Sequence, residues 1–253
     1  MIRVKLRASS RFPHRKFARP EFLLISFLLC GCDPGDIQPV LGSAFQVQGA
    51  ATISRSRGTQ DMKPRSFSTT EKFSAGDTIH LEKESSAVLC LTPGIYVRCP
   101  GETQLGIDEL TISKDGDDTG NAMHERRAAV HCDNGRLHVF LPIAGASAAQ
   151  LRIQSRSGTF TAKAGALFSV ALADNSVQVV CLRGEVYWNE GPAFSATIPA
   201  GHFWRRTGDS LEGPKLAAED ATAQQEVMAV LESVQIMADL EDAARKAPAP
   251  WRN

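Results

Sequence analysis

The chain has 253 residues, of which 43% are hydrophobic, and its 28 basic and 28 acidic side chains give a formal net charge of zero. Residues 1–31 contain seven basic side chains and one acidic one, so the remaining 222 residues carry 21 basic and 27 acidic side chains, a net charge of −6. An acidic domain without a basic stripe is poorly suited to nucleic acids and to anionic lipid surfaces. We therefore expect no nucleic-acid partner.

The N-terminal segment has the layout of an export signal. Its basic tip precedes an apolar run from Phe22 to Leu29, followed by Cys30, Gly31 and Cys32. This run is shorter than the roughly 20 apolar residues of a membrane-spanning helix and is typical of a secretory signal. A buried core segment is the alternative. Leu-Cys-Gly-Cys resembles a bacterial lipobox, which implies a lipid on Cys32 and removal of residues 1–31. We expect a periplasmic lipoprotein anchored by that lipid to the inner or the outer membrane.

Four further cysteines follow at positions 90, 99, 132 and 181. An even number in an exported domain is compatible with disulfides, and Cys90 with Cys99 is the local candidate pair. Cys90 and Cys181 nevertheless lie in apolar runs, where free cysteine packs as a small hydrophobic residue. The two interpretations remain open. His131 and His138 flank Cys132, but the paired spacing typical of a metal site is missing, so we expect neither a metal nor a cofactor.

Short strands are predicted from about Ala44 to Trp204, where apolar and polar residues alternate between turn signals. The predicted strands are 45–54, 77–83, 86–91, 94–99, 103–113, 128–133, 136–142, 149–155, 158–164, 167–173, 176–188 and 195–201. No helix-period segment separates them, which excludes βαβ units. We expect an all-β domain over residues 45–206, after a tether over 32–44. Residues 55–72 and 114–127 are expected to form exposed loops.

Alternation also predicts which side chains point inward. The expected shared faces comprise Val88, Cys90, Val97 and Cys99; Val130 and Cys132; Leu137, Val139 and Leu141; and Val177, Val179, Cys181 and Val186. The last set requires a change of frame at the turn formed by Arg183 and Gly184. Because successive strand residues point to opposite faces, a wrong register would place such a set on the wrong side of a sheet.

A linker and one amphipathic helix are predicted over residues 207–253. The helix is expected over 222–245, with a capping box at Thr222 and Gln225 and an end at Ala247-Pro248. Its apolar stripe comprises Val227, Val230, Leu231, Val234, Met237, Ala238 and Leu240. We expect this stripe to pack on the last strands, around Trp188 and Trp204, because helices draw most of their stability from tertiary packing. A docking helix for a partner is the alternative.

Several motifs of the β region resemble the FecR domain family. They include Gly76-Asp77-Thr78-Ile79, the hairpin over residues 88–97, the turn at Gly165-Ala166 where the family has Gly-Thr, and VQVVCLRGEVYW over 177–188. The resemblance extends over residues 45–206, with the motifs in family order. It implies a periplasmic β domain, solenoid-like or layered, of the kind that passes a signal from an outer-membrane receptor to a cytoplasmic sigma factor. Only about twenty residues precede the apolar run, so we expect this chain to lack the family's cytoplasmic anti-sigma segment.

No catalytic motif with a paired nucleophile and base is present, so we do not expect an enzyme. The expected function is that of a lipid-anchored envelope protein whose FecR-like domain mediates protein–protein interaction or envelope signalling. The candidate interaction surface comprises Tyr187, Trp188, Trp204, Val227, Leu231 and Val234. The alternative is a glycan- or peptidoglycan-binding lipoprotein, which would need Tyr187, Trp188 and Trp204 to form an exposed platform.

Overall fold

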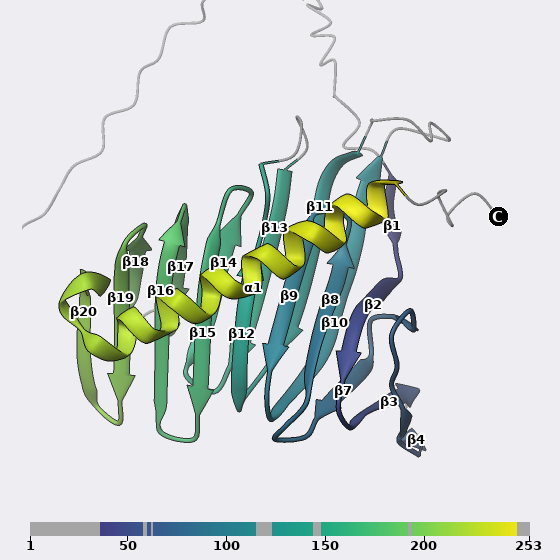
Figure 1. Ribbon diagram of the computed structural model, residues 1–253, viewed down its shortest axis with the longest axis horizontal. Coiled ribbons are helices and arrows are strands. Elements are labelled where there is room, and N and C mark those ends of the chain that lie inside the picture. Colours follow the sequence, from purple (N-terminus) through teal and green to yellow (C-terminus); the bar gives the residue numbers. More distant parts are fainter. Residues whose placement is uncertain are drawn as a thin grey trace, which may run out of the picture. The chain divides into compact units, whose positions relative to one another are not determined.

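The computed structural model of the protein describes residues 36–57, 60–61, 63–114, 123–143, 148–191 and 194–246. This part of the chain is all-β, with two sheets and a C-terminal α-helix, as the sequence predicts (Figure 1). The export signal and Cys32 lie outside the described residues, as do the centre of the predicted loop over 114–127 and the sequence after Lys246.

Two large sheets contain all the strands. The eleven-stranded sheet, here sheet A, has the order β18 (Ser195–Pro199), β17 (Glu185–Asn189), β14 (Gly158–Lys163), β13 (Ala148–Ser155), β11 (Met123–His131), β10 (Thr103–Lys114), β7 (Asp77–Leu81), β3 (Ala51–Arg57) and β4 (Gln60–Asp61), with β1 (Asp36–Pro39) beside β10 and β5 (Arg65–Ser66) beside β3. The nine-stranded sheet B has the order β20 (Ser210–Leu216), β19 (His202–Thr207), β16 (Ser176–Arg183), β15 (Leu167–Ala173), β12 (Gly135–Phe140), β9 (Ile95–Pro100), β8 (Ser86–Thr92), β2 (Gly42–Gln48) and β6 (Lys72–Phe73).

The chain moves back and forth between the two sheets as it proceeds. Hairpin β8–β9 lies in sheet B, β10–β11 in sheet A, β12 in sheet B, β13–β14 in sheet A, and the alternation continues to β19–β20. Within each sheet the strands from β7 to β20 follow one another in chain order, and Figure 1 shows this succession across the molecule. All pairings are antiparallel except that of β11 with β13. Of the two expected architectures, the layered one is observed: two sheets enclose one main core.

The main hydrophobic core lies between the sheets and confirms most of the predicted faces. Three of the four predicted sets belong to this core: Val130 and Cys132; Leu137, Val139 and Leu141; and Val177, Val179, Cys181 and Val186. The change of frame occurs where predicted, at Gly184, whose φ of +74° favours glycine. A Cβ there would also come within 3.0 Å of the Ala166 Cα.

The predicted shared face of strands β8 and β9 is wrong. Leu89 lies opposite Val97 and Cys90 opposite Tyr96, so the inward pair is offset by one residue from the prediction. Val97 and Cys99 enter the core, whereas Val88 and Cys90 belong to a separate cluster on the outer face of sheet B. Cys90 and Cys99 consequently lie on opposite faces of the sheet, and all four described cysteines are free.

The boundaries of the β domain are wider than predicted. The expected tether over 32–44 contains β1 and the start of β2, and the expected strand over 45–54 is two strands that turn at Gly49. The expected linker contains β20, which pairs with β19. These segments were missed because β1 and β20 are rich in proline, glycine and polar residues and lie mostly exposed, so their sequences lack the alternation used to detect strands.

Helix α1 (Ala221–Lys246) follows a short 3₁₀ turn, η1 (Ala217–Glu219). Asp220 caps it, because its Oδ1 accepts a hydrogen bond from the Ala223 amide at 2.7 Å. The predicted cap at Thr222 is therefore two residues too late. Figure 1 shows α1 crossing the outer face of sheet B. Within the described ranges, no helix has the length and apolar character required to span a membrane.

Candidate functional site

The outer face of sheet B presents two rows of side chains set by strand register. In the first row, here the covered row, Arg98, His138, Ser169, Val180 and Phe203 are successive cross-strand neighbours. In the second row, here the open row, the neighbours are Arg136, Ala171, Gln178 and Arg205. Residues directly opposite one another on neighbouring strands share a face, so each row is continuous. α1 lies over the covered row, and the open row runs beside it.

Two apolar clusters attach α1 to sheet B. Near its start, Ala223 packs with Val180 and Phe203. Farther along, Val230 and Met237 pack with an aromatic and aliphatic patch made by Val88, Cys90, Tyr96, Phe140 and Leu167. The expected self-docking of α1 is therefore observed. The start of the helix packs on two of the last strands, β16 and β19, as predicted. The rest of α1 continues across β15, β12 and β9, and the helix does not pack with Trp188 or Trp204.

The predicted apolar stripe of α1 is correct in part. Val230 and Met237 are buried and Val227 and Val234 are half-buried, whereas Leu231 is 48% exposed. The buried face turns instead toward Glu226 and Ser233, which share it with Val230 because residues three, four and seven apart lie on one side of a helix. The prediction wrongly placed Leu231 on the buried face because the residue is apolar, although its direction around the helix axis differs from that of Val230.

A buried polar cluster lies between the two apolar clusters. His138 is 1% exposed and contacts two residues of α1: its Nε2 is 3.1 Å from Glu226 Oε1, and its Nδ1 is 2.5 Å from Ser233 Oγ. Arg98 donates a hydrogen bond to Ser233 Oγ at 2.8 Å. Arg136 lies 3.5 Å from Glu226 Oε2. Sheet B thus supplies the basic groups, and α1 supplies the carboxylate and the hydroxyl.

Serine, histidine and a carboxylate together are also the components of a hydrolytic triad, but this arrangement does not suit one. All three side chains are buried in the contact between α1 and sheet B. The Ser233 hydroxyl donates a hydrogen bond to the Ala229 carbonyl oxygen at 2.7 Å and accepts one from Arg98. A nucleophile must reach a substrate and needs a base free to take its proton. The cluster instead has the form of a structural clamp between helix and sheet.

The charge of Glu226 is stabilised by its surroundings. Burial on its own would raise the pKa of this carboxyl. The hydrogen bond with His138, the electrostatic interactions with Arg136 and His138, and the Ser169 hydroxyl outweigh burial and hold the pKa below its usual range. Glu226 is therefore a carboxylate at neutral pH, matched to basic partners on sheet B.

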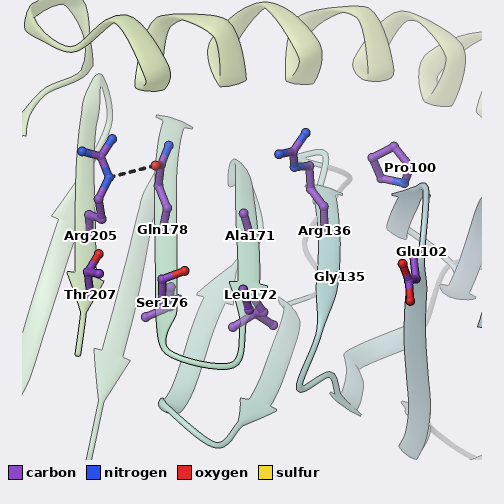
Figure 2. A pocket seen from close by; sticks show the side chains of 12 residues that line it. Pro100, Glu102, Gly135, Arg136, Ala171, Leu172, Ser176, Gln178, Arg205 and Thr207 are labelled. Carbon is purple, nitrogen blue, oxygen red and sulfur yellow. Dashed lines mark hydrogen bonds between the residues drawn. The ribbon is translucent and has the colours of Figure 1, made fainter. Parts of the chain in front are cut away.

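The open row forms the floor of a groove beside α1, with a volume of about 520 Å³. Figure 2 shows Arg136 and Arg205 at either side of Ala171 and Gln178, with α1 passing above them. Arg205 donates to Gln178 Oε1 at 3.0 Å and pairs with Asp220, the cap of α1, at 3.0 Å. Because the side chain of Ala171 is small, it does not fill the groove at this point. The groove is open along its length and lined by hydrogen-bonding groups.

The predicted aromatic platform does not form. Trp188 and Trp204 are 0% and 1% exposed, and their rings meet in the core between the sheets at a centroid distance of 4.3 Å. They cannot belong to an interaction surface, because their large apolar rings fill the space between the sheets. Tyr187 is 43% exposed and lies in a depression of about 610 Å³ on sheet A, beside Thr161 and Thr197. Among the residues that line this depression, it is the one aromatic side chain.

His131 lies on the outer face of sheet A, apart from His138. Its Nδ1 is 2.8 Å from Asp108 Oδ1, and its ring covers Gly106, where a Cβ would come within 1.8 Å of the ring. Cys132, the next residue, points into the core. Over the ranges that the structure describes, no three His, Cys, Asp or Glu side chains are placed to hold a metal ion.

The sequence reasoning missed His138, Glu226, Ser233, Arg98 and Arg136 as a group. One signal in the sequence was available for two of these five residues. Glu226 and Ser233 interrupt the apolar stripe of α1 at a spacing of seven residues, and polar residues on the buried face of a helix need partners. The identity of those partners could not be read, because 88 residues separate His138 from Glu226.

No family model matches the chain, and no curated protein matches it. Among solved structures, two crystal structures of a proposed anti-sigma factor from Parabacteroides distasonis, at 1.65 Å and 2.50 Å resolution, are similar to it with a TM-score of 0.38 each. Their identities to this chain are 14% and 13%. Each match covers 53% of this chain and 57% or 56% of the other, so the chain spans little more than half of their length.

Proposed function

We propose that this protein is a cell-envelope component whose FecR-like β domain binds another protein and takes part in envelope signalling. The FecR-like order of motifs in the sequence, from Gly76-Asp77 to the strand ending at Trp188, supports the signalling class. The structural observation that supports binding to a protein is the open groove beside α1.

The groove suits a segment of a partner protein in three respects. Its floor runs across four neighbouring strands, so it is long enough for several residues of an extended chain. Its sides carry the guanidinium groups of Arg136 and Arg205, which form directional hydrogen bonds with carboxylates and carbonyl oxygens. It is an open groove and not an enclosed cavity, whereas small-molecule sites enclose most of their ligand. Glu102 and the apolar side chains of Leu172 and Val177 also line the groove, so a partner segment with both hydrogen-bonding and small apolar side chains is the expected ligand.

The test is photo-crosslinking in intact envelopes, with a photoreactive amino acid at position 171 on the floor of the groove. We expect a discrete adduct with one partner, and a loss of that adduct when Gln178→Trp fills the groove. The matched control carries the photoreactive group at position 150, an exposed position of β13 on the outer face of sheet A that lines neither the groove nor the depression beside Tyr187. Adducts of equal yield from both positions, or an adduct insensitive to Gln178→Trp, would contradict a binding groove.

We further propose that the domain is held at a membrane by a lipid on Cys32, as the basic tip, apolar run and Leu-Cys-Gly-Cys indicate. The variant Cys32→Ala should accumulate as an uncleaved precursor without lipid, detected by mass spectrometry and by fractionation of envelopes. Cys30→Ala is the matched control and should be processed normally. Normal processing of the Cys32 variant would exclude this site of attachment.

A further inference from the structure

We propose that the covered row and its apolar flanks form a helix-binding surface, which α1 occupies within its own chain and which an amphipathic helix of a partner protein takes over by displacing α1. The inference rests on the proposed function, namely that this domain binds another protein. It assigns the partner's chemistry and a second surface, which adjoins the open groove at Arg136.

The sandwich beneath α1 has a core of its own. The main cluster between the sheets contains residues of the strands and their turns, and α1 contributes no residue to it. α1 packs only against the opposite side of sheet B. Removal of α1 therefore uncovers a face without opening the core between the sheets, so the domain can persist with the helix displaced.

The contact with α1 is that of a helix in a groove. Ala223, Val230 and Met237 are buried at intervals of seven residues, and they enter two separate apolar clusters of sheet B. Recognition of amphipathic helices uses anchors of this kind, spaced by whole turns along one face. Among the side chains of α1 that the structure describes, the most exposed large apolar one is that of Met228, at 67%. It lies on the other side of the helix and takes no part in either cluster.

The polar cluster defines what a replacing helix must carry. On sheet B, Arg98, Arg136 and His138 face the helix. Their partners on α1 are Glu226 and Ser233. A partner helix with a carboxylate and a hydroxyl seven residues apart, between apolar anchors, would make the same contacts. Buried ion pairs add little net stability because desolvation opposes their attraction. The cluster therefore selects the register of the helix without binding α1 irreversibly.

The probe is a fluorescent peptide with the sequence of α1, residues 221–246, whose binding to the chain is measured by anisotropy. In the wild-type chain, α1 competes with the peptide. In the double variant Val230→Asp/Met237→Asp, the chain's own helix is weakened while sheet B is unchanged. We expect the peptide to bind this variant at least about tenfold more tightly than the wild type, because a competing state lowers apparent affinity in proportion to its population.

Two controls accompany the measurement. The chain variant Met228→Asp changes the exposed side of α1 and should bind the peptide as weakly as the wild type. A peptide carrying both aspartates should not bind at all. If the double variant retains its β-sheet circular dichroism but fails to bind the peptide, the surface does not accept a helix in trans and the proposal is wrong.

Two further results would also overturn it. Loss of the β-sheet signal in the double variant would mean that α1 is an integral part of the fold. Concentration-dependent dimers of the wild-type chain, found by size-exclusion chromatography, would assign the surface to exchange of α1 between copies and not to a partner. A successful crosslink at position 171 alongside any of these outcomes would leave the open groove as the binding site, so the two proposals can fail separately.

Discussion

Individual carboxylates hold parts of this fold in place because each accepts several hydrogen bonds. Asp77, in the Gly76-Asp77 motif, is 1% exposed and accepts from Arg55 Nε at 2.7 Å and from the Ser74 amide at 2.8 Å. Burial raises its pKa, but these hydrogen bonds and the charge of Arg55 hold the pKa below its usual value. Gly76, with φ of +89°, makes the turn that directs Asp77 inward. The Gly76-Asp77 pair thus has a physical role: the glycine makes the turn and the aspartate accepts the hydrogen bonds.

Glu226 makes the attachment of α1 sensitive to acid. Its pKa is lower in the folded chain than in the unfolded one, so its contribution is present above the unfolded pKa of about 4.3 and is lost as the pH falls through the folded pKa. Glu226→Gln should therefore lower the free energy of unfolding by about 1–3 kcal/mol at pH 7. The difference from the wild type should shrink between pH 5 and pH 3.

Urea unfolding across this pH range measures that difference. Glu232→Gln, a change at an exposed carboxylate of the same helix, is the control and should stay within about 0.5 kcal/mol of the wild type throughout. A gap between Glu226→Gln and the wild type that is constant with pH would mean that the Glu226 charge does not stabilise the helix contact.

At the scale of elements, α1 has a helix-forming sequence rich in alanine, glutamine and glutamate, and sheet B sets its position. Its sheet-facing side nevertheless includes Val227, Val230, Ser233 and Val234, none of which is a strong helix former. Asp220 adds a cap and pairs with Arg205 of β19, so the start of the helix is tied to the sheet by one carboxylate. Tertiary contacts therefore determine where α1 lies and where it begins.

Neighbouring residues of α1 should differ sharply in their tolerance of charge. Val230→Asp places a carboxylate at a fully buried position and should cost about 3 kcal/mol, from lost apolar burial and an unpaired charge. Leu231→Asp, one residue on and half exposed, should cost about 0.5 kcal/mol or less. Thermal melts followed at 222 nm test both. Equal losses would mean that α1 presents a different face to sheet B.

For the whole molecule, the two tryptophans join the sheets near β17 and β19. Trp188 belongs to sheet A and Trp204 to sheet B, and their contact crosses the space between the layers. The indole Nε1 of Trp188 also donates to the Ser157 carbonyl at 3.1 Å, which satisfies its polar atom within the core. A residue that fills the gap between two layers stabilises both of them at once.

Trp188→Ala should accordingly destabilise the chain by about 3–5 kcal/mol, because it leaves a large cavity between the sheets. The adjacent Tyr187→Ala should cost less than about 1 kcal/mol, since Tyr187 faces solvent on sheet A. Equilibrium unfolding in urea compares the two variants. A mild effect of Trp188→Ala would show that the layers do not depend on this contact.

The sequence by itself determined the secondary structure class. Alternation between turn signals predicted the strands, the change of frame at Gly184 and the inward faces of β12 and β16, because a period of two is a local property of the chain. It also predicted a C-terminal helix that packs on its own domain. The strands β1 and β20 were not predicted, since exposed strands need no alternation of apolar and polar residues.

Only the tertiary structure decided how distant elements meet. The register between β8 and β9 placed Val88 and Cys90 on the helix side and Cys99 in the core, contrary to the expected shared face. The burial of Trp188 and Trp204 and the contact of His138 with Glu226 likewise depend on how sheets and helix stack. A sequence pattern gives the direction of a side chain within its own element, but its partner is set by packing between elements far apart in the chain.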